Sequence, residues 1–304
     1  MKNIIITFVA AVAVALGCGA QNVESLTLSG SEGKLYAELQ KPSVKAGEKM
    51  PLVIICHGFS DNCNSGLLKD IADDLQTDGI ASLRFDFNGH GRSEGRFQDM
   101  TVPNEIADLK NVIAWAQAQP WVGSISLLGQ SQGGVVASMT AGELGDKVIK
   151  SLVLMAPAAV LRDDALRGNT MGAMYDPWNM TADYVQLPFG ELKLGRKYIE
   201  AAVTLPIYET ALNYTGPVLI IHGTHDRVVP YTYGERYDHG YKNSSIELIP
   251  GEDTVSHATE RKPPSSPPTG SQKHFRKENK NTCFCNTGNC VNLQHKTEGD
   301  AENF

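Results

Sequence analysis

Apolar and polar residues follow two different patterns along this chain. Over residues 23–28 and 34–39 they alternate, which is typical of strands with one face in solvent. Further along, short and continuously apolar runs predict strands that are buried on both faces. These runs cover residues 52–56, 81–85, 125–128, 152–155 and 218–221. The alternating segments are therefore expected to pair antiparallel at the edge of a sheet whose other strands are parallel.

Helical stretches separate the buried runs. They cover residues 67–76, 104–117 and the segment after Ser131, and residues 244–249 predict one last strand. Buried strands that alternate with helices predict an α/β fold, with a mainly parallel sheet flanked by helices and wound by right-handed crossovers. A chain of 304 residues is an ordinary length for one such domain.

Residues 157 to about 208 interrupt this alternation with aromatic residues, Met, Pro and Gly. The segment lies between a strand end and the next helix, and ligands of such sheets bind outside the carboxyl ends of the strands. We therefore expect a cap insertion over a site. The alternative is a well-packed surface insertion with no role in substrate binding.

The first 20 residues have the features of an export signal. Met1 and Lys2 are followed by an apolar run at 4–16 and by small residues at 17–20, and the run is too short for a membrane span. Cleavage after Ala20 would leave a soluble periplasmic or secreted protein. Cleavage before Cys18 would leave a lipid-anchored one, but residues 15–18 match a lipoprotein signal only loosely, so we favour the soluble form.

Composition excludes some classes of function. The formal net charge is -7, and no basic surface is expected that would bind nucleic acid. The 6 cysteines are scattered over the signal, a strand, a loop and the tail, which argues against a disulfide framework. They also lack metal-ligand spacing, so we expect neither a metal nor a cofactor.

The strongest chemical signal is the segment 129–134, which reads Gly-Gln-Ser-Gln-Gly-Gly. It follows a buried strand and precedes a helix, and a serine on such a sharp turn exposes its hydroxyl as a nucleophile. The glycines are needed because side chains there would collide with the strand and the helix. We therefore predict Ser131 as the nucleophile; the alternative is a Gly-rich turn without chemistry.

Serine needs a base, and the base needs an acid that orients it; in this fold the order along the chain is Ser, Asp, His. Asp226 follows the buried run at 218–221 and lies in a loop at its carboxyl end, so it is the predicted acid. The alternative is a turn-forming role for Asp226. His222 and His225 lie at the same strand end, and we interpret them as local structural residues.

The negative oxygen of an acyl-transfer intermediate requires two backbone N–H donors. One is expected from Gln132, directly after the nucleophile, and the other from Phe59 in the loop that follows the run at 52–56. His57 is expected to stabilise that loop by hydrogen bonds. The glycine-containing turn at 86–93 is assigned a structural role.

These motifs together resemble the α/β-hydrolase family, and within it the bacterial cinnamoyl (feruloyl) esterases. The resemblance rests on residues 57–59, 88–93, 129–134 and 222–226 and covers about 23–253. It implies a cap that receives a hydroxylated aromatic ring, with an acidic residue and a tyrosine near the ring hydroxyls. Asp164 and Tyr198 fall where those residues would be. The alternative for both is surface charge and cap packing.

The resemblance breaks after Asp253. The family pattern there is Gly-x-x-His-x-Phe followed by an amphipathic helix, but this chain continues with Thr254, and His257 comes three positions late. Residues 254–304 are polar and rich in Pro and Lys, so we expect a disordered tail and a missing C-terminal helix. His257 is the best candidate for the base, against the alternative of a spectator in that tail.

A frameshift would explain the break. The segment 254–261 can be encoded by ACT GTT TCA CAC GCC ACG GAA AG, and one added C in front makes the same bases read His-Cys-Phe-Thr-Arg-His-Gly-Lys. The missing His-x-Phe motif then stands in its expected place. Our hypothesis is that the tail is a frameshifted translation.

The sequence thus predicts a serine esterase that acts through an acyl-enzyme, with Ser131, Asp226 and His257 as its triad. The resemblance implies a small-molecule hydroxycinnamate ester as substrate, of plant cell-wall origin. Two alternatives stay open. One is a serine aminopeptidase or thioesterase with the same residues, and the other is a non-catalytic descendant.

Overall fold

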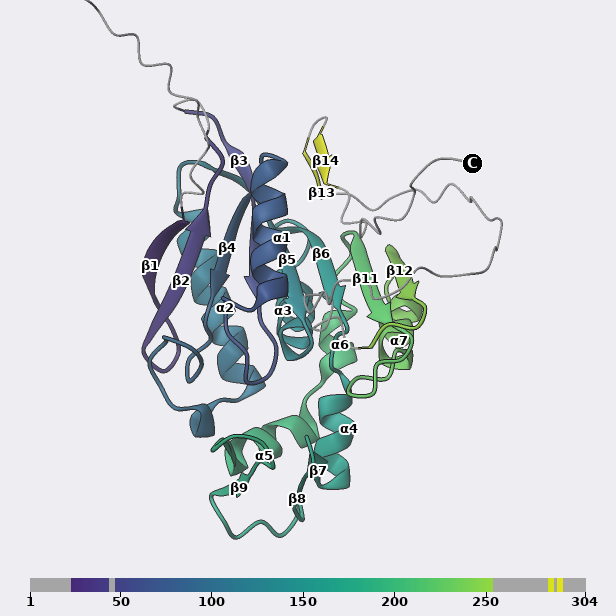
Figure 1. The fold of residues 1–304 in the computed structure, drawn as a ribbon. Coiled ribbons are helices and arrows are strands. Elements are labelled where there is room, and N and C mark those ends of the chain that lie inside the picture. The colour runs from purple at the N-terminus through teal and green to yellow at the C-terminus, as the bar shows by residue number, and fades with distance from the viewer. Residues whose placement is uncertain (1–22, 44–46, 254–283, 287–288, 292–304) are drawn as a thin grey trace, which may run out of the picture.

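The computed structural model describes residues 23–43, 47–253, 284–286 and 289–291. Its centre is an eight-stranded sheet of order β1-β2-β4-β3-β5-β6-β11-β12 (Figure 1). β2 pairs antiparallel with β1 and with β4, and the remaining neighbours are parallel. The strands are β1 (Val23–Ser29), β2 (Lys34–Gln40), β3 (Met50–Cys56), β4 (Ala81–Phe85), β5 (Val122–Gln130), β6 (Ile149–Met155), β11 (Val218–Gly223) and β12 (Ser244–Ile249). The predicted antiparallel edge and parallel centre are both confirmed.

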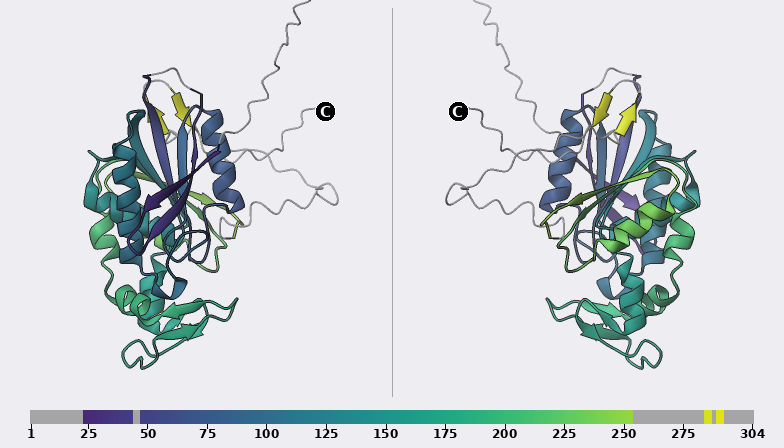
Figure 2. Two further views of the ribbon diagram at one scale, coloured as in Figure 1. Left: turned by 90° about the vertical axis from the view of Figure 1, so that its left-hand side faces the viewer. Right: turned by 90° about the vertical axis from the view of Figure 1, so that its right-hand side faces the viewer.

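Helices cover both faces of this sheet. α1 (Gly66–Thr77) lies on one side, and α2 (Val102–Gln117) and α3 (Gln132–Leu144) lie on the other (Figure 2). α2 begins at a capping box, in which the Thr101 hydroxyl accepts from the Asn104 amide and the Asn104 side chain accepts from the Thr101 amide. α6 (Ile207–Ala211) packs on α3, and α7 (Thr232–Gly240) packs on β11 and β12. The α/β class predicted from the sequence is thus confirmed.

The two faces differ in how well they are covered. On the α1 side, the helical members of the apolar cluster all come from α1, and they pack on β3, β5, β6 and β11. At the β12 end of that face, Leu219 and Ile249 are only half-buried in the part of the chain that the structure describes. The expected loss of the C-terminal helix concerns residues after Asp253, which lie mostly outside the described residues, so it stays a prediction.

The insertion between β6 and β11 lies at one end of the molecule (Figures 1 and 2). It begins with α4 (Val160–Arg167) and ends with α5 (Arg196–Thr204), which pack on each other. Between them lie four short strands: β7 (Asn169–Thr170), β8 (Ala173–Met174), β9 (Tyr184–Gln186) and β10 (Lys193–Gly195). β10 also contacts the short helix η1 (Phe97–Asp99), so the insertion is anchored to the sheet domain.

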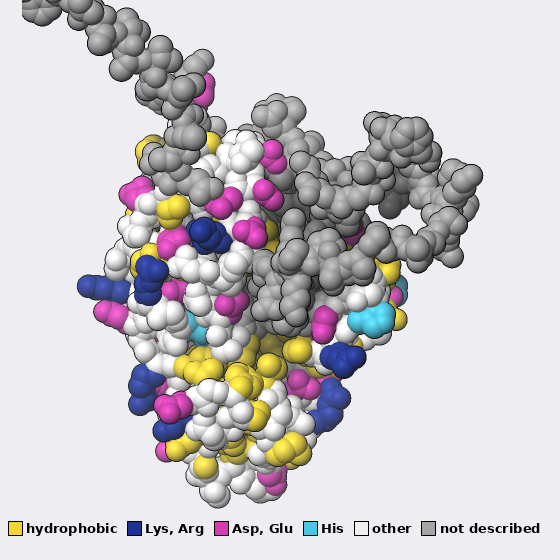
Figure 3. Space-filling view, viewed as in Figure 1, with side chains coloured by type: hydrophobic (Ala, Val, Ile, Leu, Met, Phe, Trp, Pro, Cys, Tyr) yellow, Lys and Arg dark blue, Asp and Glu magenta, His cyan; other side chains and the backbone are white. Residues whose placement is uncertain are grey.

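Exposed apolar side chains concentrate in this insertion. Figure 3 shows them gathered toward that end, whereas acidic and basic side chains are interspersed over the viewed face. The largest exposed ones in the insertion are Leu166, Met171, Met174, Trp178, Tyr184 and Phe189. This distribution fits the cap composition from which the sequence predicted an insertion.

The two ends of the chain are mostly outside the described residues. The expected signal at 1–20 and His257 fall there, so both stay predictions. Within the tail, β13 (Phe284–Asn286) and β14 (Asn289–Val291) pair antiparallel with each other, and the expected disorder of the tail otherwise falls outside the described residues. No helix among the described residues has the length and apolar composition needed to cross a bilayer.

A buried ion pair joins the antiparallel edge to the parallel strands. The Arg84 guanidinium on β4 donates to Glu38 at 2.9 Å, to Gln40 at 2.8 Å and to the carbonyl oxygen of Cys63 at 2.8 Å. Arg84 is 1% exposed. Because its partners come from β2 and from the loop after β3, this one side chain joins three segments.

We predict that Arg84→Met lowers the free energy of unfolding by about 3–5 kcal/mol, because it leaves the buried Glu38 carboxylate without its cation. Urea unfolding would measure this. The matched control is Arg96→Met, which removes an exposed ion pair with Asp99 and should cost under about 1 kcal/mol. Equal losses in the two variants would contradict the interpretation.

Candidate active site

Ser131 lies on a strained turn between β5 and α3. Its backbone has φ 54° and ψ -122°, a conformation that residues other than glycine rarely adopt. Hydrogen bonds to the neighbouring strand end maintain it, since the Ser131 amide donates to the Met155 carbonyl at 2.9 Å and the Ser131 carbonyl accepts from Ala158 at 3.0 Å. The hydroxyl therefore stands at the carboxyl edge of the sheet, where the sequence placed it.

Two glycines allow this turn to be so tight. A Cβ on Gly129 would lie 2.3 Å from the carbonyl oxygen of Gly133, and a Cβ on Gly133 would lie 2.3 Å from the carbonyl oxygen of His57. Both contacts are with backbone, which cannot give way as a flexible side chain can. The Gly-x-Ser-x-Gly pattern thus reflects the close approach of β5, α3 and the loop after β3.

The loop after β3 contacts the nucleophile directly. A Cβ on Gly58 would lie 3.1 Å from the Cβ of Ser131 and 3.7 Å from its hydroxyl oxygen. Phe59 is the next residue, and Gln132 is the first residue of α3, where backbone N–H groups have no partner within the helix. The two predicted oxyanion donors therefore lie on segments that flank Ser131, at the positive end of a helix dipole.

His57 stabilises this loop, as the sequence indicated. Its Nε2 accepts from the Phe87 amide at 3.1 Å, so Nδ1 carries the proton and donates to the Gly58 carbonyl at 2.8 Å. Burial lowers the pKa of the imidazole and favours its neutral form. With both ring nitrogens engaged, His57 is not placed to act as a base for Ser131.

Asp226 lies just beyond the end of β11, in a buried position. Its Oδ1 accepts from the amides of Val228 and Val229 at 2.9 Å and 2.8 Å, which orients the carboxylate. Its Oδ2 lies 3.6 Å from Nε2 of His222. That nitrogen donates to the Val229 carbonyl at 2.8 Å, so His222 supports the acid loop, which is the structural role expected of it.

The chain after β12 passes beside this acid loop. A Cβ on Gly223 would lie 2.5 Å from the carbonyl oxygens of Glu252 and Asp253, and the His225 amide donates to the Glu252 carbonyl at 2.8 Å. β11 and β12 end level, since Gly223 pairs with Ile249. The segment expected to supply the base therefore leaves the described structure next to Asp226.

The structure places both predicted substrate-binding residues in the cap. Asp164 on α4 is 30% exposed and lies 3.7 Å from Arg167, and partial burial raises the pKa of its carboxyl. Tyr198 on α5 is 1% exposed, and its hydroxyl donates to Gln132 Oε1 at 2.8 Å. Burial raises the pKa of Tyr198 well above its usual value.

Sequence reasoning missed Glu105 on α2. Glu105 is 2% exposed, its Oε2 accepts from Gln132 Nε2 at 2.9 Å, and burial raises its pKa well above the usual value. The available signal was its position three residues after Val102 and four before Leu109, on the apolar stripe of an amphipathic helix. A carboxyl on such a stripe must be buried and therefore needs a partner.

Aromatic side chains near the elbow pack on one another. The Phe59 ring packs edge-to-face on Phe97, with centroids 5.2 Å apart, and on Tyr198 at 5.9 Å. Phe97 in turn packs on His90 at 5.2 Å. Phe59, whose amide is a predicted oxyanion donor, thus belongs to a cluster of packed aromatic rings.

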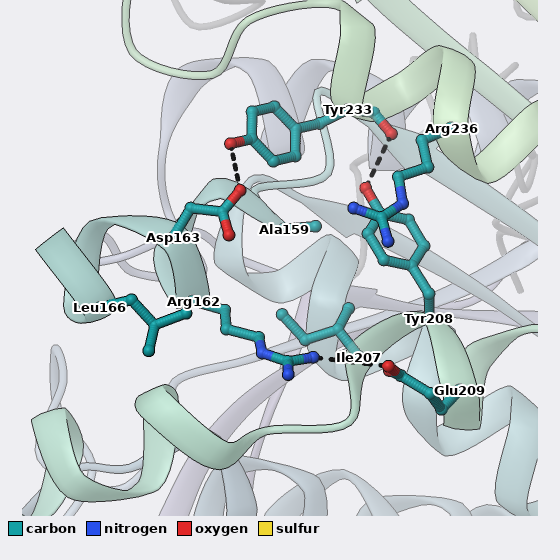
Figure 4. Close-up of a pocket in the computed structure, with 9 residues that line it drawn as sticks. All are labelled: Ala159, Arg162, Asp163, Leu166, Ile207, Tyr208, Glu209, Tyr233 and Arg236. Atoms are coloured by element: carbon teal, nitrogen blue, oxygen red, sulfur yellow. Dashed lines mark hydrogen bonds and ion pairs between the residues drawn. The ribbon is translucent and has the colours of Figure 1, made fainter.

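Two surface hollows of about 260 and 270 Å³ lie elsewhere, and neither is lined by Ser131 or Asp226. Figure 4 shows the first, between α4, α6 and α7, where the Tyr233 hydroxyl donates to Asp163 at 2.6 Å. Its other polar side chains also pair within the hollow: Arg162 with Glu209, and Arg236 over the ring of Tyr208. These contacts tie the cap to α7.

Among the described residues, no cluster of His, Cys, Asp and Glu could hold a metal.

We predict that buried His90 makes the fold sensitive to acid. Burial, and then His57, lowers the pKa of His90 to about 3. The unfolded chain binds this proton near pH 6.5, so stability should fall below pH 6.5 by up to about 1.4 kcal/mol per pH unit. Urea unfolding of His90→Leu between pH 7 and pH 4 should give a shallower slope than the parent. Equal slopes would contradict the prediction.

We also predict that the strain at Ser131 is measurable. Ser131→Ala and Ser131→Gly both remove the hydroxyl, but only glycine adopts the turn without strain. The glycine variant should therefore be more stable than the alanine variant by roughly 1 kcal/mol. Thermal or urea unfolding would measure the difference, and a less stable glycine variant would contradict it.

Comparison with known proteins agrees with this fold. A family model described as serine aminopeptidase, S33, matches residues 47–186. Est1E from Butyrivibrio proteoclasticus, solved with ferulic acid bound, is 32% identical to this chain, with a TM-score of 0.71 over 75% of this chain and 90% of Est1E.

Curated relatives match over shorter parts. An uncharacterized 31.7 kDa protein of Escherichia coli, from the traX-finO intergenic region, is 35% identical over 37% of this chain and 40% of its own length. The mitochondrial palmitoyl-protein thioesterase ABHD10 of Mus musculus is 27% identical over 60% of this chain and 61% of its own length. The chain thus spans less than two thirds of either relative. The match to Est1E covers more of both chains, 75% of this one and 90% of Est1E, and it shows that this chain belongs to the α/β-hydrolase family and, within it, resembles the cinnamoyl and feruloyl esterases.

Proposed function

We propose that this protein hydrolyses carboxylic esters through an acyl-enzyme on Ser131, and that its substrates are hydroxycinnamate (feruloyl) esters. The observation that carries the proposal is the strained elbow, which presents the Ser131 hydroxyl between the loop of Gly58 and the N-terminus of α3. A serine in this conformation serves nucleophilic attack, because strain of this kind persists where function requires it.

The proposed reaction has two halves. The base takes the proton of Ser131 while its oxygen bonds to the ester carbon, and the Phe59 and Gln132 amides stabilise the negative oxygen. The bond to the alcohol then breaks, and the alcohol leaves with the proton. Water, deprotonated by the same base, attacks the acyl-enzyme and releases the acid and the serine. No step needs a metal or a cofactor.

Asp226 is the proposed acid, and His257, or the histidine that it replaces, is the proposed base. His257 follows Asp253 by four residues, and four residues span at most about 14 Å. Because the Asp253 carbonyl lies beside Gly223, the base has a short path to Asp226. Catalysis tolerates little misplacement, so the three-residue displacement relative to the family pattern is expected to lower the rate.

Two observations support an aromatic acyl group. Phe59 and Phe97 are partly buried aromatic side chains beside the elbow and favour a flat apolar ring, and Est1E was solved with ferulic acid bound. Asp164 is the side chain best placed to meet a ring hydroxyl, since it is partly exposed in the cap. A small ester of plant cell-wall origin, met by an exported periplasmic or secreted enzyme, fits the proposal.

A second candidate function is thioester or peptide hydrolysis with the same nucleophile. It is favoured by the relative named as a palmitoyl-protein thioesterase and by the aminopeptidase description of the family model. A third candidate is a non-catalytic descendant, because the chain departs from the family pattern at the position of the base.

We predict that a fluorophosphonate probe labels the full chain at Ser131, and that Ser131→Ala abolishes labelling. Asp226→Asn should slow labelling by roughly 10³-fold, because the base then loses its orienting partner. Methyl ferulate should be hydrolysed faster than a palmitoyl thioester or an aminoacyl anilide. A chain with the restored reading frame should react faster than the parent.

The controls separate the candidates. An unlabelled parent together with a labelled frame-restored chain would show that the base is lost, and would rule out His257. If neither chain is labelled, the catalytic proposal is wrong. If the enzyme hydrolyses the thioester or the anilide faster than methyl ferulate, thioester or peptide hydrolysis replaces ester hydrolysis as the proposed function.

A further inference from the structure

A buried chain of hydrogen bonds joins the cap to the nucleophile elbow. The Gln132 side chain lies between two partners: its Oε1 accepts from the Tyr198 hydroxyl at 2.8 Å, and its Nε2 donates to Glu105 Oε2 at 2.9 Å. All three side chains are at most 2% exposed. The connection is thus shielded from water, which would otherwise compete for each bond.

The three residues belong to three different parts of the fold. Tyr198 lies on α5 of the cap, Glu105 lies on α2 of the sheet domain, and Gln132 begins α3. The amide faces a donor with its oxygen and an acceptor with its nitrogen, so a rotation of the Gln132 side chain would break both bonds. Because unsatisfied buried polar groups are costly, this network specifies one position for Gln132.

That position matters because the Gln132 backbone N–H is the proposed oxyanion donor. The residue follows Ser131 directly, and hydrogen bonds that fix its side chain at both ends also restrain the backbone that carries this amide. We propose that Tyr198 and Glu105 are positioning residues, which hold the Gln132 amide at the oxyanion site through its side chain and tie that site to the cap. This inference rests on the proposed function.

The charge state of Glu105 fits this role. Its burial, together with the nearby Asp108, raises its pKa and favours the neutral carboxyl. A neutral carboxyl and a carboxamide have nearly the same shape, so Glu105→Gln retains an acceptor for Gln132, whereas Glu105→Leu does not. The two substitutions therefore differ in whether position 105 can accept the hydrogen bond from Gln132.

The network also gives Tyr198 a role different from the one that the family resemblance implies. A tyrosine that binds a ring hydroxyl would discriminate hydroxylated from unhydroxylated substrates. In the structure the Tyr198 hydroxyl already donates its hydrogen bond to Gln132 Oε1. A positioning residue affects all acyl groups equally, because the oxyanion is common to them.

We predict that Tyr198→Phe lowers kcat by roughly tenfold on both methyl ferulate and methyl cinnamate, with KM changed less than about twofold. Loss of a whole oxyanion donor costs roughly 10²–10³ in kcat, and a displaced donor should cost part of that. Glu105→Leu should behave in the same way, and Glu105→Gln should keep most of the parent's kcat.

The matched control is Tyr214→Phe. Tyr214 is also 1% exposed and donates its hydroxyl to one carbonyl, that of Ile149 at 3.0 Å. Tyr214→Phe should lower the stability but keep the parent's kcat on both esters. A Tyr198→Phe effect confined to methyl ferulate would instead assign Tyr198 to the ring hydroxyl and overturn the proposal, as would an unchanged kcat on both esters.

A second measurement does not depend on turnover. Hydrogen exchange of the peptide that contains residues 130–134 should be faster in Tyr198→Phe than in the parent, and unchanged in Tyr214→Phe. If the parent is not labelled by the fluorophosphonate probe, the proposed function fails, and this measurement still decides whether the network holds the elbow. Unchanged exchange in Tyr198→Phe would overturn the positioning role.

Discussion

The active site depends on one constrained residue, the strained backbone of Ser131. A conformation of this kind costs roughly 1–3 kcal/mol and persists only when its surroundings determine it. Here the constraint comes from the ends of two parallel strands, because the Ser131 amide and carbonyl bond to Met155 and Ala158. Gly129 and Gly133 let the backbones approach closely enough for those bonds. The sheet, the elbow and the helix dipole at the nucleophile thus form one arrangement.

The centre of the sheet was predictable because the parallel strands β3, β4, β5, β6 and β11 are largely buried on both faces. Two of the expected ranges, 81–85 and 244–249, coincide with β4 and β12, and the others fall within the observed strands. A parallel strand that is covered by helices on both faces has no solvent-exposed side. Its sequence is therefore continuously apolar, which makes it easy to recognise. Asp226 was predictable for the same reason, since its place follows from the end of β11.

The polar contacts between elements were not predictable. Glu105 and Tyr198 are 27 and 66 positions away from Gln132, and no local pattern indicates which buried polar groups will meet. Arg84 presents the same difficulty, because it interrupts an apolar strand and its partners come from β2 and a distant loop. Such contacts depend on how whole elements pack, whereas periodicity describes one element at a time.

The predicted nucleophile and the predicted base belong to different parts of the chain. The elements that form the elbow are therefore separate from the segment that is expected to supply the base. β11 and β12 end level, so Asp226 and the segment after Ile249 emerge side by side. The predicted nucleophile and acid follow strands that other strands flank, but the predicted base belongs to the segment beyond the edge strand β12. A change in that segment is therefore separated along the chain from the elements that form the elbow and the oxyanion loop. The departure from the family pattern after Asp253 falls in that segment, so it concerns the expected base and not the elbow.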